Sequence, residues 1–212
     1  MTHIDYTLYL VTDRSVMSAK SLEQAVEQAI QGGCTVVQLR EKYASSREFF
    51  ETAQRVKQIT DSYHIPLIIN DRTDICLAVN AAGIHIGQQD LPAKIVRSMV
   101  GPDKIIGVSA ATLSEAIQAE QDGADYLGVG AMFATSTKTN TRPVTIERLT
   151  QIKQAVQIPV VAIGGIQSSN VTTLTDTGID GIAVVSAILA HENITHAAEQ
   201  LKACFTGAGH EV

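Results

Sequence analysis

The amino-acid sequence predicts an α/β fold, a single (β/α)8 TIM barrel that spans residues 1–212. Three observations lead to this prediction: eight alternations of strand-like and helix-like segments, strands that are mostly apolar along their whole length, and a chain of 212 residues. Continuous apolar strands indicate a parallel sheet that is buried on both faces. Short strand–helix–strand connections also require parallel strands and right-handed crossovers. A doubly wound sheet fits the length too, but an open sheet with this many strands usually needs more chain.

Eight β-branched runs are predicted to be strands, at residues 6–12, 34–39, 66–69, 83–86, 104–108, 125–129, 159–163 and 180–185. Between them, apolar residues recur at helical spacing, most clearly over 22–30 and more approximately over 49–59 and 146–156. A last helical pattern over 194–201 closes the chain, and a further helix is expected to start near Ser168. We expect left-handed helix ends at Gly32-Gly33, Ala82-Gly83, Gly123-Ala124 and Gly178.

Composition excludes several classes of partner. The net charge of −6 argues against a general affinity for nucleic acid or anionic membranes, so an anionic small molecule would need a local positive cluster. No run approaches the roughly 18 apolar residues of a spanning helix, and the polar start is unlike a signal peptide. Three scattered cysteines predict reduced core thiols in a cytoplasmic protein. Whether the chain forms a homo-oligomer is left open.

Polar residues gather where each predicted strand ends, which is where (β/α) barrels place their chemistry. They are Thr12-Asp13-Arg14, Gln38, Arg40, Lys42, Asn70-Asp71, His85, Gln88, Asp90, Ser109, Thr135-Ser136-Thr137-Lys138, Gly164-Gly165 and Ser186. We therefore expect one site at this end of the barrel. His85 is the exception, because a buried, hydrogen-bonded core histidine is the simpler interpretation of a lone histidine there.

The second strand is predicted to bring positive charge to this site. Period-two alternation directs Gln38 and Arg40 into the barrel and Leu39 toward the helices. The planar fork of Arg40 suits a phosphate, and Lys42 adds a mobile point charge. The alternative is a structural ion pair between Arg40 and Glu41 or a neighbouring aspartate.

Two aspartates are candidate metal ligands. Asp71 and Asp90 follow adjacent strands, and two carboxylates beside Arg40 and Lys42 would form a hard oxygen site for Mg²⁺ completed by substrate phosphate. The alternative is that each caps the following helix, since Asp is a favoured N-cap and Pro92 stands two residues after Asp90.

A second phosphate site is predicted from the later strands. Three hydroxyls and one ammonium group in the 135–138 loop form an anion clamp, unless the loop is only solvated surface. Gly164-Gly165 and Ser186 match the phosphate site that many barrels build from their last two strands. A tight turn that needs glycine for conformation alone is the alternative.

The motifs together resemble the thiamine phosphate synthase family from the first strand to the eighth. The matching pieces are LYLVTD, QLREK, IND, GIHIGQQD, GVS, DYLGVG, TSTK, AIGGI and VVSAI, in this order. Each piece is weakly specific alone, but their order along almost the whole chain is a specific signal. The chain has Gly130-Ala131 where the family usually has Gly-Pro, which bears on loop rigidity and not on a contact residue.

The resemblance implies that hydroxymethylpyrimidine diphosphate reacts with a thiazole phosphate, or its carboxylate form, to give thiamine monophosphate and pyrophosphate. It assigns the pyrimidine diphosphate to Gln38, Leu39, Arg40, Glu41, Lys42, Asn70, Ser109 and Lys138, and the thiazole phosphate to Thr135, Ser136, Thr137, Gly165, Val185 and Ser186. It assigns Mg²⁺ to Asp71 and Asp90. Arg40, Lys42, Ser109 and Lys138 would be catalytic, by stabilising the leaving group while a pyrimidine carbocation is captured by the thiazole nitrogen.

Three other functions are weighed against this one. A thiazole tautomerase paralogue would not need the diphosphate and metal residues, and the histidine expected there after the fifth strand is absent from Ser109-Ala110-Ala111. A non-catalytic phosphate-binding barrel would be expected to lose Lys138 or the aspartate pair. A phosphosugar isomerase would need a catalytic Glu or paired bases at strand ends, and none is obvious.

Overall fold

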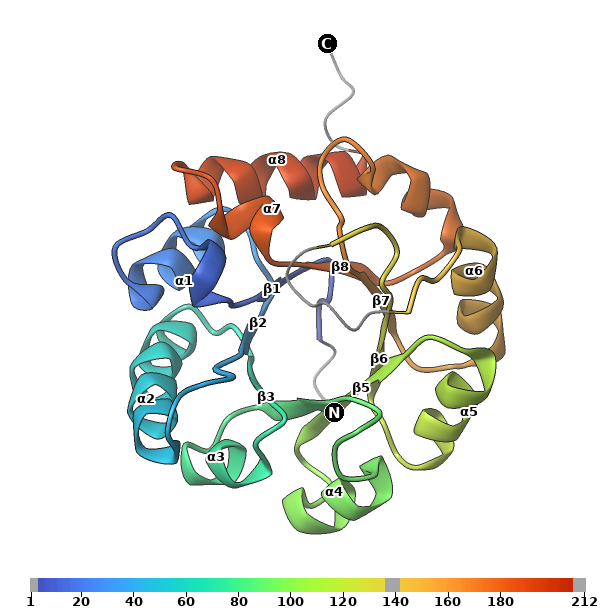
Figure 1. Cartoon of the computed structure of the whole chain (residues 1–212), viewed down its shortest axis with the longest axis horizontal. Helices are drawn as coiled ribbons and strands as arrows, with labels where there is room; N and C mark the ends of the chain where they lie inside the picture. Colours follow the sequence, from blue (N-terminus) through green and yellow to red (C-terminus); the bar gives the residue numbers. More distant parts are fainter. Residues whose placement is uncertain (1–3, 136–141, 208–212) are drawn as a thin grey trace.

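The computed structural model describes residues 4–135 and 142–207, which form a closed barrel of eight parallel strands in sequence order (Figure 1). The strands are β1 (Leu8–Val11), β2 (Val36–Leu39), β3 (Leu67–Asn70), β4 (Gly83–Ile86), β5 (Ile105–Ala110), β6 (Tyr126–Val129), β7 (Val160–Ile163) and β8 (Gly181–Val184). Strand β8 pairs with β1 and closes the barrel. Each strand falls inside or overlaps its predicted run, so the predicted fold class is confirmed.

Helices form a ring outside the strands (Figure 1). They are α1 (Leu22–Gln31), α2 (Ser46–Ser62), α3 (Thr73–Ala78), α4 (Ala93–Val100), α5 (Leu113–Gln121), α6 (Ile146–Ala155), α7 (Ser186–Leu189) and α8 (Ile194–Thr206), with 3-10 helices η1 (Arg14–Val16) and η2 (Val171–Thr177). Reciprocal capping boxes at Ser45/Glu48 and Thr112/Glu115 start α2 and α5. Local sequence signals therefore fix where these two helices begin.

The connection between β7 and β8 differs from the prediction of a helix that starts near Ser168. The described structure has the 3-10 helix η2 from Val171 instead. Its threonines explain the difference: the hydroxyls of Thr173, Thr175 and Thr177 each donate to the carbonyl three residues earlier. Such local bonds and β-branching disfavour a regular α-helix.

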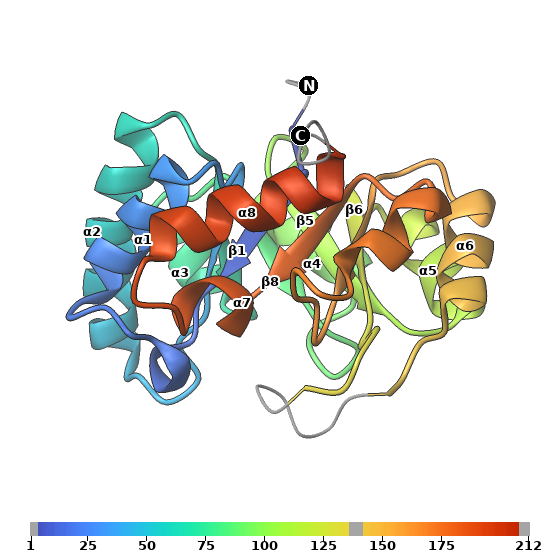
Figure 2. The ribbon, with the colours of Figure 1, turned by 90° about the horizontal axis from the view of Figure 1, so that it is seen from above.

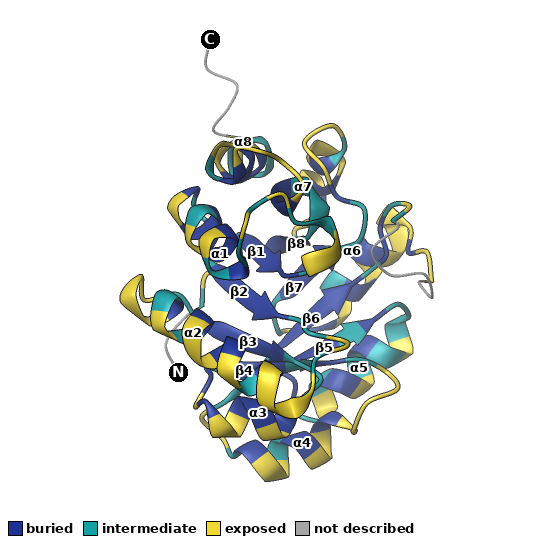
Figure 3. Cartoon of the chain, turned by 60° about the vertical axis from the view of Figure 1, so that its left-hand side comes forward, coloured by how far each residue is buried: buried dark blue, intermediate teal, exposed yellow. Residues whose placement is uncertain are grey.

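Two apolar layers follow from the period-two alternation of the strands. Leu8 and Leu10 of β1 pack toward the helices, whereas Tyr9 and Val11 point into the barrel. The same alternation sends Leu39 outward. Figure 3 shows the strands buried and the exposed residues confined to outer helix faces and loops. The barrel interior is therefore a packed core beneath any site at its end.

The glycine prediction was right at three helix ends and wrong at one. Gly33, Gly123 and Gly178 have positive φ, from 74° to 96°. At Ala82-Gly83 the left-handed residue is Asn80, with φ 51°. Gly83 instead belongs to β4, where an added Cβ would lie 2.2 Å from a carbonyl oxygen of β5. Close strand approach, and not a helix end, requires that glycine.

All three cysteines are free thiols. Burial raises the pKa of Cys34 to about 12 and that of Cys76 to about 11. Both thiols therefore stay protonated near neutral pH, as expected for core cysteines.

The carboxyl ends of the strands meet at one end of the barrel. Figure 2 shows α7 and the segment that follows β6 at this same end. In the described part of the chain, no helix is both long and apolar enough to cross a membrane.

Candidate active site

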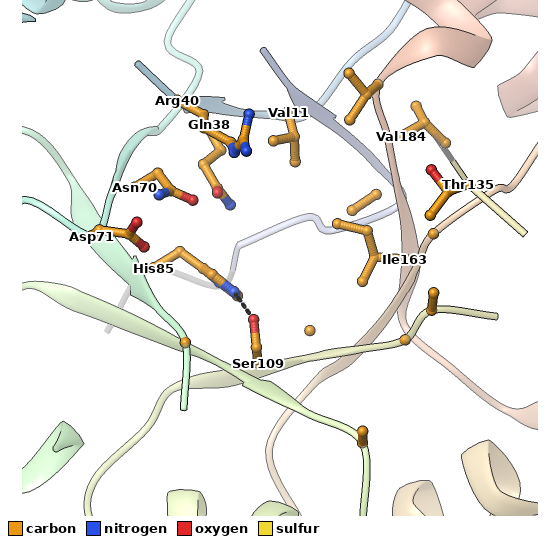
Figure 4. A pocket seen from close by; sticks show the side chains of 18 of the residues that line it. Val11, Gln38, Arg40, Asn70, Asp71, His85, Ser109, Thr135, Ile163 and Val184 are labelled. Atoms are coloured by element: carbon orange, nitrogen blue, oxygen red, sulfur yellow. Dashed lines mark hydrogen bonds between the residues drawn. The ribbon is translucent and has the colours of Figure 1, made fainter. Parts of the chain in front are cut away.

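A cavity of about 820 Å³ opens at the carboxyl ends of the strands. Polar side chains from β2 to β5 occupy one side of it, and Val11, Ile163 and Val184 form an apolar wall on the other (Figure 4). The predicted site residues that line it are Gln38, Arg40, Lys42, Asn70, Asp71, Asp90, Ser109, Thr135, Gly165, Val185 and Ser186. Polar residues far apart in the sequence are thus brought to a single pocket.

Some predicted residues are placed elsewhere. Leu39, the last residue of β2, is fully buried in the layer between the strands and the helices. Glu41 forms an ion pair with Arg14, with 2.6 Å between Nε of the arginine and Oε1 of the glutamate. Neither lines the pocket. Ser136, Thr137 and Lys138 lie outside the described residues, so their assignments stay predictions.

Arg40 is held from two sides by the end of β1. Its Nη1 lies 2.8 Å from Oδ2 of Asp13, and its backbone N–H donates to Oγ1 of Thr12 at 2.9 Å. The predicted alternative of an ion pair is therefore real, with Asp13 as the partner and not Glu41. The guanidinium nevertheless lines the pocket, so the pair orients it there and leaves other N–H groups to bind an anion.

Asp71 and Asp90 do not cap helices. The N-cap positions of α3 and α4 are Arg72 and Pro92, and neither makes a side-chain capping bond. Asp71 instead has a φ of 62°, a left-handed conformation that costs a non-glycine residue about 1 kcal/mol or more. Its backbone N–H donates to the carbonyl of His85 at 2.9 Å. The turn thereby holds the carboxylate of Asp71 at the pocket wall, where it forms an ion pair with Lys42.

The two carboxylates share one corner of the pocket. Burial raises the pKa of Asp90, the N–H of Gly87 lowers it by donating to Oδ2 at 2.7 Å, and the negative charge of Asp71 raises it further. Across the described ranges, no group of three or more His, Cys, Asp or Glu side chains is arranged to hold a metal by itself. A pair of carboxylates does fit Mg²⁺, which commonly takes its remaining oxygens from phosphate and water.

The opposite side of the pocket is built from the ends of β7 and β8. Gly164 and Gly165 have φ of 100° and 65°, and a Cβ on Gly165 would lie 2.4 Å from the carbonyl oxygen of Ala134. Backbone approach therefore requires glycine here. Val185 and Ser186 complete this wall at the start of α7.

His85 and Arg142 are polar pocket residues that were not predicted as site residues. His85 was expected to be a core histidine, but it lines the pocket and bonds to Ser109, with 2.9 Å between Nε2 and Oγ (Figure 4). Its inward position one strand before Ser109 was the available signal. Arg142 also lines the pocket and forms a bidentate pair with Glu115, at 2.7 and 2.9 Å. No spacing in the sequence pointed to that pair.

The family model for thiamine monophosphate synthase matches residues 8–188, which is most of the chain. The chain belongs to this family. It is 61% identical over 202 residues to the thiamine-phosphate synthase of Ruminiclostridium cellulolyticum, covering 95% of this chain and 96% of that one. It is 58% identical over 200 residues to the thiamine-phosphate synthase of Alkaliphilus oremlandii, covering 94% of this chain and 96% of the relative.

A solved structure gives the same result. The thiamine phosphate pyrophosphorylase from Pyrococcus furiosus superposes with a TM-score of 0.89 at 38% identity, over 97% of this chain and 98% of that one. These matches confirm the predicted thiamine phosphate synthase family and, with it, a transferase of thiamine biosynthesis.

Proposed function

We propose that this pocket joins hydroxymethylpyrimidine diphosphate to a thiazole phosphate and releases thiamine monophosphate and pyrophosphate. The observation that carries the proposal is the cluster of Arg40 and Lys42 with Asp71 and Asp90 at adjacent strand ends of one pocket. Two cations and two metal-fitting carboxylates suit a diphosphate, and the thiamine-phosphate synthase relatives support this substrate class. A volume of about 820 Å³ is ample for two small heterocycles.

The two substrates divide the pocket between them. The pyrimidine diphosphate lies along the polar side, against Gln38, Arg40, Lys42, Asn70 and Ser109. The thiazole phosphate lies at the opposite side, against Thr135, Gly165, Val185 and Ser186. Lys138, Ser136 and Thr137 follow Thr135 directly and remain predicted partners of the two phosphates.

Asp71 and Asp90 would hold Mg²⁺ against the diphosphate, where the ion would neutralise charge that develops on the leaving group. Arg40, oriented by Asp13, and Lys42 stabilise the same charge from the protein side. The bond between the pyrimidine methylene carbon and the diphosphate oxygen breaks, and pyrophosphate keeps the electron pair. The thiazole nitrogen then supplies the pair for the new C–N bond. The apolar wall of Val11, Ile163 and Val184 limits access of water to the reacting carbon.

The three free thiols support a reducing compartment, as in the cytoplasm. Nothing in the described pocket favours a thiazole tautomerase, because the cations and carboxylates of the polar side would then be without use.

The test is pyrophosphate release by the purified chain, with both substrates and either Mg²⁺ or EDTA. Asp71→Asn should abolish release, whereas Asp74→Asn, a matched change of an exposed carboxylate on α3 outside the pocket, should not. Release that needs both substrates and the metal supports the synthase. Equal loss in both variants, or release in EDTA, would contradict the assignment of Asp71, and no release under any condition would reject the activity.

A further inference from the structure

A continuous chain of hydrogen bonds runs beneath the pocket and joins two of its lining residues, Gln38 and Ser109. Nε2 of Gln38 donates to the Tyr9 hydroxyl at 2.9 Å, and the hydroxyls of Tyr9 and Tyr126 are 2.7 Å apart. The Tyr126 hydroxyl lies 2.9 Å from Nδ1 of His85. On the other side of the ring, Nε2 of His85 lies 2.9 Å from Oγ of Ser109 (Figure 4). The two tyrosines are fully buried and do not line the pocket.

Which group donates in each of these bonds can be inferred, because each tyrosine hydroxyl has only one hydrogen to donate. Burial raises the pKa of Tyr9 and of Tyr126, so each phenol keeps its single hydrogen near neutral pH. The Tyr9 oxygen accepts from Gln38, and either hydroxyl of the Tyr9–Tyr126 pair could be the donor to the other. Only donation by Tyr9 gives the Tyr9 hydrogen an acceptor among its partners in the described part of the chain. The hydrogen of Tyr126 is then directed to Nδ1 of His85.

The same order continues to the pocket. A neutral imidazole that accepts at Nδ1 carries its proton on Nε2. In that tautomer, the Nε2–H of His85 donates to Oγ of Ser109. The hydroxyl hydrogen of Ser109 then points away from His85, because the space between the two groups already holds the imidazole proton. Ser109 lines the pocket, so it faces a ligand as a hydrogen-bond donor.

The sequence reserves space for this arrangement. His85, Gly107 and Tyr126 are register partners across β4, β5 and β6. A Cβ on Gly107 would lie 2.1 Å from Cζ of Tyr126, so the missing side chain on β5 lets the side chains of β4 and β6 meet. Gly128 likewise leaves room for His85, whose Cε1 would be 3.0 Å from a Cβ there. Gly107 and Gly128 therefore make room for the side chains of Tyr126 and His85, a role that is unrelated to turns.

We propose that Tyr9 and Tyr126 are positioning residues: they fix His85 in the Nε2–H tautomer and thereby hold Ser109 as a donor toward an acceptor atom of the bound heterocycle, such as a ring nitrogen. The identity of that heterocycle rests on the proposed function. The order of the hydrogen bonds does not, because it is a property of the protein without substrate.

The first test measures the protein with its network unaltered, and a variant is used only to assign signals. Heteronuclear NMR of the full chain with ¹⁵N-labelled histidine reports which ring nitrogen of each histidine is protonated, and His85→Gln assigns the signals of His85. The proposal expects the Nε2–H tautomer at neutral pH. The Nδ1–H tautomer would reverse the order of the bonds and overturn it, whether or not the chain makes thiamine phosphate.

The second test compares Tyr126→Phe with Tyr6→Phe. Tyr6 packs against Tyr126 with ring centroids 4.9 Å apart, but its hydroxyl is outside the network, so it is a matched control. Tyr126→Phe should give His85 a mixture of tautomers and lower kcat for pyrophosphate release at least tenfold, with KM for the thiazole phosphate unchanged. Tyr6→Phe should change neither. An unchanged tautomer and kcat in Tyr126→Phe, or equal effects in both variants, would overturn the proposal.

Discussion

Arg97 provides the sharpest test of how the barrel is held together away from the pocket. This α4 side chain reaches the amino-terminal side of β5 and β6. Its guanidinium donates to the carbonyls of Gly101, Lys104 and Gly123 at 2.9, 2.6 and 2.9 Å, and it pairs with Asp125. Asp125 in turn accepts from a backbone N–H of β5. Arg97→Ala would leave all four of these acceptors without their shared donor.

The expected cost can be worked from these contacts. A hydrogen bond to a charged group contributes about 1.5 to 3 kcal/mol where water is excluded. The side chains of Arg97 and Asp125 are 24% and 27% exposed, so water replaces part of what is lost. We therefore expect a loss of about 3 kcal/mol in the free energy of unfolding, well below the sum of four full bonds. For a chain of this size, that corresponds to a fall in Tm of roughly 6 to 12 °C.

Thermal and urea denaturation followed by circular dichroism would measure this loss. Arg55→Ala is the matched control, since Arg55 and Glu23 form a single ion pair in which the arginine is half exposed, and its removal should cost less than about 1 kcal/mol. Activity of Arg97→Ala at 25 °C should stay at the wild-type level, because Arg97 does not line the pocket. Equal stability of the two variants would refute the reasoning that the shared acceptors matter.

Three further predictions concern the pocket. Burial and the negative charge of Asp71 raise the pKa of Asp90, so its charged form destabilises the metal-free fold above that pKa. Asp90→Asn should therefore raise Tm at pH 7 in calorimetry without metal, while abolishing metal-dependent pyrophosphate release. A Tm that stays the same or falls in Asp90→Asn would contradict this expectation. Arg40→Lys should weaken pyrophosphate binding about tenfold in titration calorimetry, because the single ammonium group of lysine cannot bind Asp13 and a phosphate at the same time as the guanidinium fork can. Unchanged affinity would contradict the assignment of Arg40 to the diphosphate. Gly165→Ala should raise KM for the thiazole phosphate in steady-state kinetics and leave KM for the diphosphate unchanged. The reason is that Gly165 has a φ of 65° and that an added Cβ would meet backbone atoms at the thiazole side of the pocket. Equal changes in both KM values would contradict the assignment of Gly165 to the thiazole phosphate.

The positions of the strands could be predicted because each strand is a short, mostly apolar run rich in β-branched residues, the pattern of a parallel strand buried on both faces. The segment after β7 was harder to predict. A helix was expected to start near Ser168, but Thr173, Thr175 and Thr177 bond back to the main chain and the segment forms a 3-10 helix. Helix periodicity does not report that competition, since it counts where apolar side chains fall and not what hydroxyl groups do.

Most of the candidate site could be predicted from one rule, that polar residues at strand ends converge. Which of these residues form ion pairs with one another could not be predicted. Arg40 had Glu41 beside it in sequence, yet it pairs with Asp13 of the neighbouring strand end, while Glu41 turns to Arg14. Adjacent residues on an extended segment point to opposite sides, so the sequence neighbour is the less available partner. Choosing among more distant partners requires the register between strands, which the sequence alone does not supply.

His85 was interpreted as a core residue because the sequence does not show which residues lie beside it in the neighbouring strands. Both interpretations of it contain part of the result, because one ring nitrogen bonds to the buried Tyr126 and the other to Ser109 in the pocket. A histidine between two layers cannot be classified by its own position. What distinguishes the site is Gly107, the register partner of both His85 and Tyr126. A glycine inside an apolar strand, flanked in register by two large polar side chains, indicates that those side chains meet across it, and the barrel thereby connects its buried tyrosines to its pocket.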